Sequence, residues 1–320
     1  MTLSSFIIGN MLDGKLNETE MVDRFGDFDL SSLTPEALAE AAKELQKRMV
    51  KIDLPGEPVD TCGTGGSGKE RINTSTIVAF LVATAGAKVA KHGNKSAGGR
   101  CGSFDLLEGL GAKIELTPEQ EKIVYETLGI VFLFARAHHP AMKHVAAARK
   151  TYGKPTIFNL LGPLCNPAGS VRPLTGVSGV YNIRLIADAQ KILGRKYGYI
   201  VQGTDGLDEI TLNGETKIID LTTGVEERRN PEDFGMQRRS EAELRGGDAS
   251  ENIRLTLQIA SGKGSLAHQD LVCLNAAYAL TLAGISKNPQ EGLAVARELL
   301  SSGKVQKMID AYVSLTSKLS

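Results

Sequence analysis

The chain has 320 residues, of which 42% are hydrophobic and 23% are charged, and its 37 Lys and Arg residues balance its 37 Asp and Glu residues. This composition is that of an ordinary folded protein with one large domain or two modest ones. Because the net charge is zero, no overall electric field favours nucleic acid or an anionic membrane, and we expect neither as a partner.

The cysteines and the apolar stretches indicate the compartment. Four cysteines lie far apart without a CxxC pair, which argues against a zinc knuckle and a disulfide scaffold. The first residues lack a basic run, so we expect no secretory signal. The longest apolar stretch, residues 77–87, is far shorter than the roughly 20 residues that span a bilayer. We therefore predict a soluble, cytoplasmic protein.

Residues 1 to about 55 predict helices only. The clearest helix begins at Thr34, which is a capping residue followed by Pro35 and Glu36, both suited to a first helical turn. Its apolar side chains then repeat at helical spacing. The proline-rich residues 53–58 break this pattern, and we place the first boundary there. The polar residues before Thr34 predict a short link.

From residue 59 onward, predicted strands and helices alternate. The β-rich runs are residues 88–90, 130–134, 156–158, 199–201 and 217–220. Capped helices are predicted to begin at Ser103, Thr117 and Asn182 and to end at glycines. Such alternation favours an α/β fold with a largely parallel sheet. The charged residues 226–245 predict a solvated connection.

The first candidate anion site is the glycine-rich run at residues 62–69, which precedes a helix predicted near Asn73. Glycines permit positive φ angles and expose N–H donors, and the helix adds its dipole. The spacing also matches the dinucleotide fingerprint and nearly matches the nucleotide P-loop. However, residues 88–91 are basic where the fingerprint needs an acid, and Glu70 follows Lys69 where the P-loop needs Ser or Thr. A plain surface turn remains the alternative.

Two further polar runs follow predicted strands, where open α/β sheets bind ligands. Residues 91–96 combine lysines, an imidazole and an amide, which suits a phosphate-bearing substrate, although a basic surface loop is equally compatible. Asp208 and Glu209 are typical oxygen ligands for a hard divalent cation, with a solvated acidic turn as the alternative.

Arg149 could clamp a carboxylate through two hydrogen bonds, although for an isolated arginine a surface ion pair is the more common explanation. His138, His139 and His144 do not have the spacing of a zinc-protease motif, so we expect no protein-held zinc there.

Together these motifs resemble the anthranilate phosphoribosyltransferase family of tryptophan biosynthesis. The matching segments are residues 63–66, 73–76, 89–94, 102–103 with 105–108, 139–142, 158–164 with 166–167, 206–209, 231–235, 246–249 with 251–252, and 275–277. One such motif is weak, but this series in the right order along most of the chain is highly specific.

The resemblance implies a small helical domain, from residues 1–55 and about 137–168, and a larger α/β domain, from residues 56–136 and 169–320. The larger domain would hold a mostly parallel central sheet flanked by helices, with the active site at the hinge. The implied reaction transfers phosphoribosyl from 5-phosphoribosyl 1-pyrophosphate (PRPP) to the amine of anthranilate. It implies Mg²⁺ or another divalent cation, with two ions on the diphosphate, and a homodimer.

By matched position, the resemblance also implies site residues. The donor would be bound by Gly63, Thr64, Gly65, Gly66, Ser67, Asn73, Ser75, Thr76, Lys91, Asn94 and Ser103. The acceptor would be bound by His92, Asn94, His139, Arg149, Gly162 and Pro163. The metal would be held by Ser75, Asp208 and Glu209, and no dedicated catalytic nucleophile is expected.

The chain departs from the family pattern in two places. Ser67 stands where the family loop usually has Asp, which removes a carboxylate near a polyanion. The N-terminal helical region looks about one hairpin shorter than usual, so we expect a homodimer with a non-standard interface.

Three other functions compete with this reading. A pyrimidine nucleoside phosphorylase is the nearest, but the Asp208–Glu209 pair and the His139–Pro140 and Gly162–Pro163 segments favour a diphosphate donor. A non-catalytic nucleic-acid-binding relative should carry surplus basic charge. A P-loop nucleotide hydrolase is disfavoured by Glu70.

Overall fold

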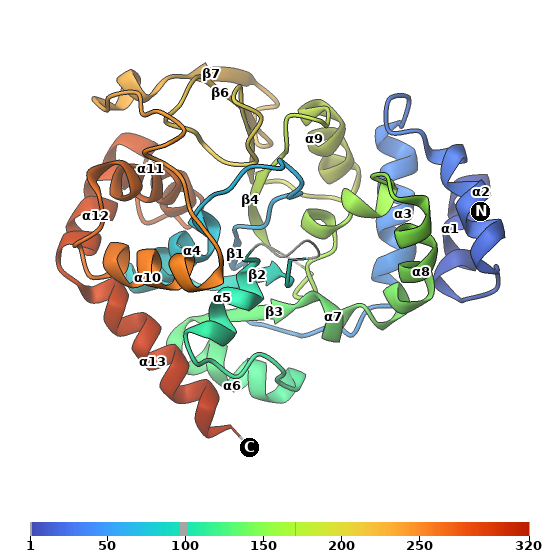
Figure 1. Cartoon of the computed structure of the whole chain (residues 1–320), viewed down its shortest axis with the longest axis horizontal. Helices are drawn as coiled ribbons and strands as arrows, with labels where there is room; N and C mark the ends of the chain where they lie inside the picture. The colour runs from blue at the N-terminus through green and yellow to red at the C-terminus, as the bar shows by residue number, and fades with distance from the viewer. Residues whose placement is uncertain (1, 97–100, 170, 320) are drawn as a thin grey trace.

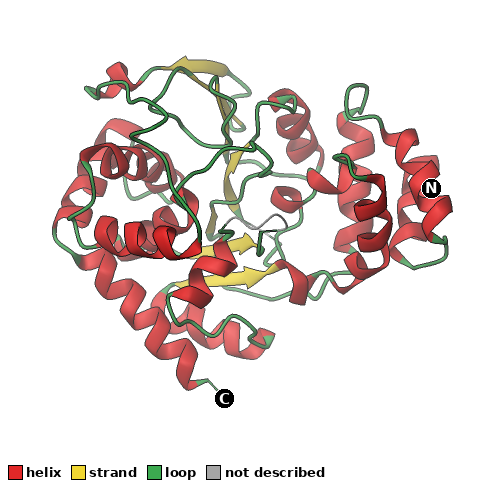
Figure 2. Cartoon of the chain, viewed as in Figure 1, coloured by secondary structure: helices red, strands yellow, loops and turns green. Residues whose placement is uncertain are grey.

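A computed structural model describes residues 2–96, 101–169 and 171–319. Its centre is a seven-stranded sheet with strand order β3-β2-β1-β4-β5-β6-β7 (Figures 1 and 2). The strands are β1 (Val59–Asp60), β2 (Val89–Gly93), β3 (Ile130–Phe134), β4 (Arg172–Gly176), β5 (Tyr199–Gly203), β6 (Thr216–Asp220) and β7 (Glu226–Arg229). Strands β1 to β5 pair in parallel, whereas β6 and β7 add an antiparallel edge. The predicted α/β fold with a largely parallel sheet is confirmed.

Helices from both halves of the chain cover the sheet. On the left of Figure 1 they are α4 (Thr74–Thr84), α5 (Ser103–Gly109), α6 (Pro118–Leu128), α10 (Ala249–Ala260), α11 (Leu266–Leu282), α12 (Pro289–Ser301) and α13 (Lys304–Lys318). Helices α4 and α11 are buried along most of their length, as expected of helices that are apolar on all sides. They form the main hydrophobic core together with one face of the sheet.

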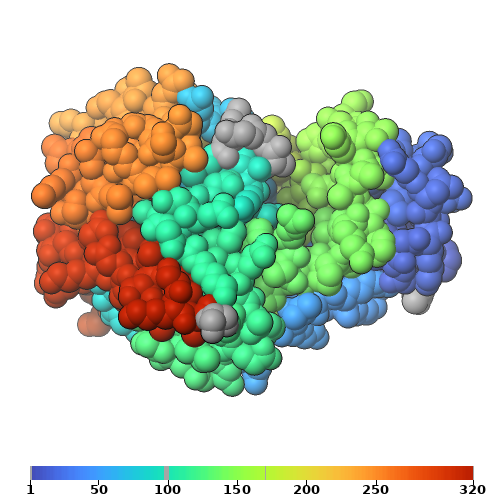
Figure 3. Space-filling view, turned by 60° about the horizontal axis from the view of Figure 1, so that its bottom comes forward, coloured from blue at the N-terminus to red at the C-terminus, as the bar shows by residue number. Residues whose placement is uncertain are grey.

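A lobe of helices lies on the other side of the molecule (Figure 1). It contains α1 (Leu3–Leu12), α2 (Glu18–Phe25), α3 (Pro35–Gln46), the short α7 (Ala135–His138) that leads into it, and α8 (Lys143–Tyr152). Phe25 of α2 packs edge-on against Tyr152 and Phe158. This second core continues onto α9 (Ile183–Ile192) and the neighbouring face of β5 and β6. The molecular surface is hollowed between the two parts (Figure 3).

Helix boundaries follow the predicted caps. The hydroxyl of Thr34 accepts a hydrogen bond from the N–H of Ala37 at 3.2 Å, and Thr117 forms a capping box with Gln120. Helix α6 ends at Gly129 with a φ of 75°, a left-handed conformation that favours glycine. These helix starts and this helix end are confirmed.

One predicted strand is wrong. Residues 156–158 do not form a strand; Ile157–Asn159 form a 3₁₀ turn, η3. The cause is local, because the side chain of Asn159 accepts a hydrogen bond from the N–H of Thr156 at 2.9 Å and closes the turn. A side-chain bond of this kind competes with a strand ladder.

Three strands were not predicted, because each is very short or has a sequence that is untypical of a strand. Strand β1 has two residues, β4 contains Pro173, and β7 consists of four charged residues. Charge is tolerated in β7 because it is an edge strand. Residues 226–245 are therefore more than a solvated connection, since Phe234, Met236 and Leu244 along them are buried. The short polar link before Thr34 likewise contains η1 (Gly26–Phe28), where Phe28 is buried.

Among the helices of the described residues, none is both long enough and apolar enough to cross a membrane.

Candidate active site

The polar motifs meet at one edge of the sheet. Since β1 to β5 are parallel, the loops that follow their carboxyl ends lie together. The strand order also reverses between β1 and β4, the position at which open α/β sheets bind ligands. The glycine-rich loop leaves β1 at this position, and the acidic loop at residues 205–209 follows β5.

Hydrogen bonds fix the glycine-rich loop in place. The N–H of Thr64 donates to the carbonyl of Gly176 at 2.9 Å, and the hydroxyl of Thr64 accepts from the N–H of Ser178 at 3.0 Å. The N–H of Gly65 donates to Oδ2 of Asp208 at 2.8 Å. The loop is therefore tied both to the end of β4 and to the acidic loop.

Two features of this loop require glycine. Gly65 and Gly66 have φ angles of 65° and 86°, in the left-handed region that side chains disfavour. At Gly63 a Cβ would lie 2.6 Å from Oδ2 of Asp208. Glycine at this position lets the loop approach the acidic side chain.

The loop forms one wall of a cavity of about 360 Å³, which we call the donor cavity. It lies at the start of α4. Its lining residues include the predicted Gly63, Gly65, Gly66, Ser67, Asn73, Ser75, Asp208 and Glu209. The lining also includes Lys69, Glu70, Arg71, Gly247 and Asp248, which the donor-site prediction did not contain. The donor cavity is therefore surrounded by backbone amides, hydroxyls and charges of both signs.

Three predicted donor residues are not among the lining residues of this cavity. Thr76 is fully buried in α4. Nζ of the buried Lys91 donates to the carbonyl of Thr61 at 3.2 Å. The hydroxyl of Ser103 donates to the carbonyl of Asn94 at 3.3 Å. Their predicted role in holding the donor stays a prediction.

The acidic loop carries three carboxylates, each with a hydrogen-bond donor. Asp208 accepts from the glycine-rich loop, as described above. Glu209 accepts from Nη1 of Arg71 at 2.7 Å, and Asp205 accepts from the hydroxyl of Thr211 at 2.6 Å. The side chain of Asn275 in α11 accepts a hydrogen bond from the N–H of Ile210 at 2.9 Å and donates one to the carbonyl of Ile210 at 2.8 Å. The loop is thus fixed before any ligand binds.

Burial changes the acidity of Glu209. The side chain is 14% exposed. Burial, followed by repulsion from Asp208 and Asp205, raises the pKa of Glu209 to about 7 against the opposing effect of Arg71. Additional positive charge at this position would relieve the repulsion. Among the described residues, no three His, Cys, Asp or Glu side chains gather closely enough to hold a metal ion.

Glu70, which the sequence suggested would repel phosphate, is paired with a cation. Its carboxylate accepts a hydrogen bond from Nε of Arg245 at 2.6 Å. This ion pair compensates the negative charge that Glu70 brings to the rim of the donor cavity.

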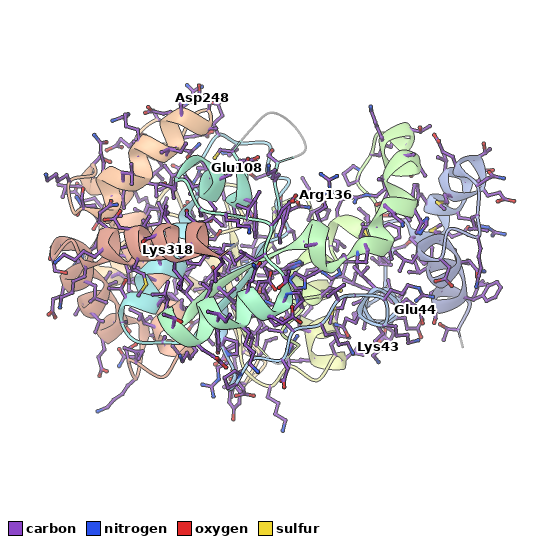
Figure 4. All side chains as sticks on the ribbon, turned by 90° about the horizontal axis from the view of Figure 1, so that it is seen from below. Lys43, Glu44, Glu108, Arg136, Asp248 and Lys318 are labelled. Carbon is purple, nitrogen blue, oxygen red and sulfur yellow. The ribbon has the colours of Figure 1, made fainter. Side chains whose placement is uncertain are left out.

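A second cavity of about 830 Å³ lies between the sheet edge and the helical lobe; we call it the acceptor cavity. The predicted residues in its lining are Thr64, His92, Asn94, His139, Arg149 and Gly162. The predicted Pro163 is buried next to Gly162. Arg136, Met142, Lys143, Phe158 and Asn159 also line it. In Figure 4, Arg136 lies between Glu108 of α5 on one side and Lys43 and Glu44 of α3 on the other.

Two buried imidazoles face each other in the acceptor cavity. The rings of His92 and His139 are 5.0 Å apart, edge to face. Burial is the main cause that lowers the pKa of His92 to about 3 and that of His139 to about 4. Both rings are therefore neutral at pH 7. Nδ1 of His92 lies 2.9 Å from the carbonyl of Gly162, which makes Nδ1 the donor and leaves Nε2 as an acceptor.

Arg149 is a partly buried cation in the same cavity. One guanidinium nitrogen donates to the side chain of Asn159 at 3.3 Å, and burial lowers the pKa of Arg149. The neighbouring His138 does not line this cavity. Its Nε2 instead lies 2.9 Å from Oε1 of the buried Glu121.

The two cavities meet at the glycine-rich loop. Thr64 lines the acceptor cavity, while Gly63 and Gly65 line the donor cavity. Sequence reasoning missed Arg71 and Arg136, although both adjoin motifs that it used. The signal for Arg71 was its position between the glycine-rich loop and the start of α4, and for Arg136 its position just after β3.

Comparison with known proteins identifies the family of the chain. The family described as "Glycosyl transferase family, a/b domain" matches residues 56–306. The anthranilate phosphoribosyltransferase of Desulfitobacterium hafniense (strain Y51) is 42% identical over 311 residues, which cover 96% of this chain and 92% of the relative. This chain belongs to the anthranilate phosphoribosyltransferase family.

Solved structures of anthranilate phosphoribosyltransferases agree. The enzyme from Thermus thermophilus has a TM-score of 0.93 at 35% identity, with 98% of this chain and 94% of that chain covered. The enzyme from Saccharomyces cerevisiae, solved in complex with PRPP and Mg, has a TM-score of 0.82 at 29% identity, with 89% and 81% covered. The family resemblance found in the sequence motifs is confirmed.

Proposed function

We propose that this chain transfers the 5-phosphoribosyl group of PRPP to the amine of anthranilate, releasing pyrophosphate. The observation that carries the proposal is the division of the site at Thr64, with a cavity of glycines, hydroxyls and carboxylates on one side and a cavity with neutral imidazoles and arginines on the other. The yeast relative solved with PRPP and Mg supports the donor. A yeast relative solved with 4-fluoroanthranilate supports the acceptor.

The donor cavity suits the diphosphate of PRPP. Positive φ angles in the glycine-rich loop present backbone N–H groups, and α4 begins beside them. Together they provide partial positive charge without a mobile side chain. We assign diphosphate binding to Gly63, Gly65 and Gly66.

The carboxylates Asp208 and Glu209 and the hydroxyl of Ser75 line the same cavity, and they fit Mg²⁺, which prefers to bridge carboxylates and substrate phosphates. Burial and the neighbouring carboxylates raise the pKa of Glu209, so a bound cation would favour its ionised form. When bound there, the ion would neutralise charge that develops on the departing pyrophosphate.

The acceptor cavity suits a flat aromatic acid. Arg149 and Arg136 offer guanidinium groups for a carboxylate, and Phe158 and Met142 offer apolar surface. We assign the anthranilate carboxylate to Arg149. We assign His92 and His139, whose neutral rings line the same cavity, to the path of the anthranilate ring.

The chain positions the amine rather than activating it. His92 and His139 are weak bases because their pKa values are low, and efficient general bases have pKa values near the working pH. Holding the amine beneath C1 of the ribose supplies effective concentration, which lowers the barrier without a base. The amine proton becomes acidic once the new N–C bond forms.

We also propose that the molecule forms two domains that close on each other, and that it assembles as a cytoplasmic homodimer. Leu3 and Phe6 of α1 are 74% and 54% exposed, which offers apolar surface on the helical lobe. All four cysteines are free, as suits a reducing compartment. Light scattering after size-exclusion chromatography measures the mass, and a monomer at working concentration would contradict the homodimer.

The reaction is tested by following anthranilate fluorescence with PRPP and Mg²⁺, with and without a chelator. We expect a loss of fluorescence that requires chain, donor and metal. Persistence of fluorescence, combined with phosphorolysis of a pyrimidine nucleoside, would contradict the proposal.

A further inference from the structure

His138 and Glu121 form a buried pair that the reaction proposed above does not use. The side chain of His138 is 3% exposed and that of Glu121 is 2% exposed. Nε2 of His138 lies 2.9 and 3.0 Å from the two carboxylate oxygens of Glu121, and Nδ1 lies 2.7 Å from the carbonyl of Val50. Buried ionisable groups are costly unless they are paired, so these contacts indicate what the pair does.

The His138 ring donates from both of its nitrogens. A backbone carbonyl can only accept, so Nδ1 carries a hydrogen. Burial alone would lower the pKa of His138, but the hydrogen bond to Glu121 raises it above its usual value. The pair is therefore an imidazolium and a carboxylate joined by a charge-assisted hydrogen bond.

The pair joins three parts of the chain, which we call the junction. Glu121 belongs to α6, one of the helices that cover the sheet. Val50 lies in the segment that leads from α3 of the helical lobe to β1, and His138 ends α7, which leads from β3 to the helical lobe (Figure 1). The backbone carbonyl of His138 also accepts from the N–H of Val50 at 2.8 Å. His138 therefore ties these two connections to each other, and Glu121 ties them to α6.

Other contacts fix the same junction. The hydroxyl of Tyr125, one turn further along α6, donates to the carbonyl of Pro55 at 2.9 Å. Ile52 and Leu54 pack with Tyr125 in a small hydrophobic core of their own. The buried ion pair is thus the charged part of a junction that is otherwise held by apolar contacts and backbone hydrogen bonds.

The junction adjoins the acceptor cavity. His139 follows His138 directly, and its ring faces that of His92 in this cavity. After burial, His138 is the next cause that lowers the pKa of His139, so the imidazolium helps to keep the His139 ring neutral. Leu45 of α3 and Arg149 of α8 also line the cavity, so its width depends on where the helical lobe lies relative to the sheet.

The donor cavity does not share this dependence. Within the part of the chain that the structure describes, its lining lies in residues 63–75, 101, 207–209 and 247–248 and contains no residue of α1, α2, α3, α7 or α8. A change confined to the junction should therefore alter the acceptor cavity and leave the donor cavity unchanged. This difference separates positioning from a general loss of stability, which would affect both cavities.

We propose that Glu121 and His138 are positioning residues for the aromatic acceptor, because together they hold the helical lobe against the sheet edge and keep His139 opposite His92. The proposal rests on the acceptor role given above to this cavity. Neither Glu121 nor His138 is in the cavity lining, so both act through the backbone that leads to His139 and the helical lobe.

Calorimetry with two ligands tests the proposal without turnover. Anthranilate, and separately pyrophosphate with Mg²⁺, are titrated into the wild-type chain and into Glu121→Gln, which keeps the size of the side chain but removes its charge. We expect the anthranilate Kd to rise roughly 10-fold, in the range of one hydrogen bond to a charged group, while the pyrophosphate Kd stays constant. An unchanged anthranilate Kd, or equal rises for both ligands, would overturn the proposal.

The binding measurement also separates this proposal from the proposed reaction. A chain that binds anthranilate but makes no phosphoribosylanthranilate would contradict the reaction, whereas the two Kd values would still decide the positioning role. If the wild-type chain itself does not bind anthranilate, both proposals fail.

Two further variants separate positioning from stability. Glu126→Gln is the matched control, because this carboxylate lies on the same helix but is exposed, and both of its Kd values should equal those of the wild type. Glu121→Leu combined with His138→Phe removes both partners, so that no buried charge is left unpaired, and such a replacement can be nearly neutral for stability. We expect this double variant to keep wild-type circular dichroism and pyrophosphate binding but to bind anthranilate roughly 10-fold more weakly. If Glu121→Gln fails to fold, the double variant decides, and wild-type anthranilate binding by it would overturn the proposal.

Discussion

The donor and acceptor cavities lie on opposite sides of one loop and are built by different means. The donor cavity uses backbone N–H groups, glycines with positive φ and carboxylates fixed by hydrogen bonds. The acceptor cavity uses side chains that come from both the sheet edge and the helical lobe, and its imidazoles are neutral because they are buried. The comparison teaches that the first cavity offers fixed dipoles and ion pairs to a ligand, whereas the second offers shape and a few polar contacts.

The largest effect is expected at the acidic loop. Asp208→Asn removes a charge that faces the donor cavity, and we expect kcat to fall by roughly 100- to 1,000-fold, as when preorganised electrostatic groups are lost. Steady-state kinetics over a Mg²⁺ titration measures it. Asp310→Asn, at an exposed position of α13, is the control. Normal activity and metal response in Asp208→Asn would remove this residue from the donor site.

The second-largest expected effect concerns one substrate and leaves the other nearly unchanged. Arg149→Ala should raise the anthranilate KM by roughly 10- to 100-fold, because hydrogen bonds to charged groups contribute about 1.5–3 kcal/mol, while the KM for PRPP stays nearly constant. Both constants come from initial rates with one substrate varied. Lys150→Ala, at the exposed position next to Arg149, is the control. An unchanged anthranilate KM would refute the carboxylate role of Arg149.

The buried imidazoles predict a pH effect on stability. The pKa of His92 is about 3 in the folded chain and about 6.5 when unfolded. Between these values the unfolded chain binds more protons, so stability is fully present above pH 6.5 and falls as the pH drops. The fall is at most roughly 1.4 kcal/mol per pH unit for one imidazole.

Urea unfolding at pH 7, 5.5 and 4.5 measures this effect. We expect His92→Asn to lose less stability on acidification than the wild type, whereas His144→Asn, at an exposed position, should behave as the wild type does. Equal losses in His92→Asn and the wild type would contradict the buried, neutral imidazole.

The smallest effect is expected at Ser67. Ser67→Asp adds a carboxylate to the donor cavity lining, and we expect it to shift the half-saturating Mg²⁺ concentration by roughly 10-fold or less, the range of one modest charged contact. Ser67→Ala, which adds no charge, should shift it less. If Ser67→Asp and the wild type give the same half-saturating Mg²⁺ concentration, position 67 does not contribute to binding of the metal or the diphosphate.

The sequence predicts those parts of the fold and site that depend on neighbouring residues. Capping at Thr34 and Thr117 and the glycine-rich loop are local patterns, and they were predictable. Strands β1 and β4 were not, because two residues or a proline give no alternation to recognise.

The partners of the site residues depend on contacts far apart in the chain. Asp208 meets Gly65 across 143 positions, and Arg71 meets Glu209 across 138. Only the reversal of strand order between β1 and β4 brings these residues together. The motifs therefore named much of the lining of both cavities, whereas the pairing of Arg71 with the acidic loop and the division of the site at Thr64 required the fold.

The division of the site into two cavities is tested most directly by binding both ligands to one sample. Anthranilate is titrated into the wild-type chain by isothermal calorimetry, with and without saturating pyrophosphate and Mg²⁺. Separate cavities predict that anthranilate binds in both cases with the same stoichiometry. Loss of anthranilate binding in the presence of pyrophosphate and Mg²⁺ would show that the two ligands share one cavity and would contradict the account.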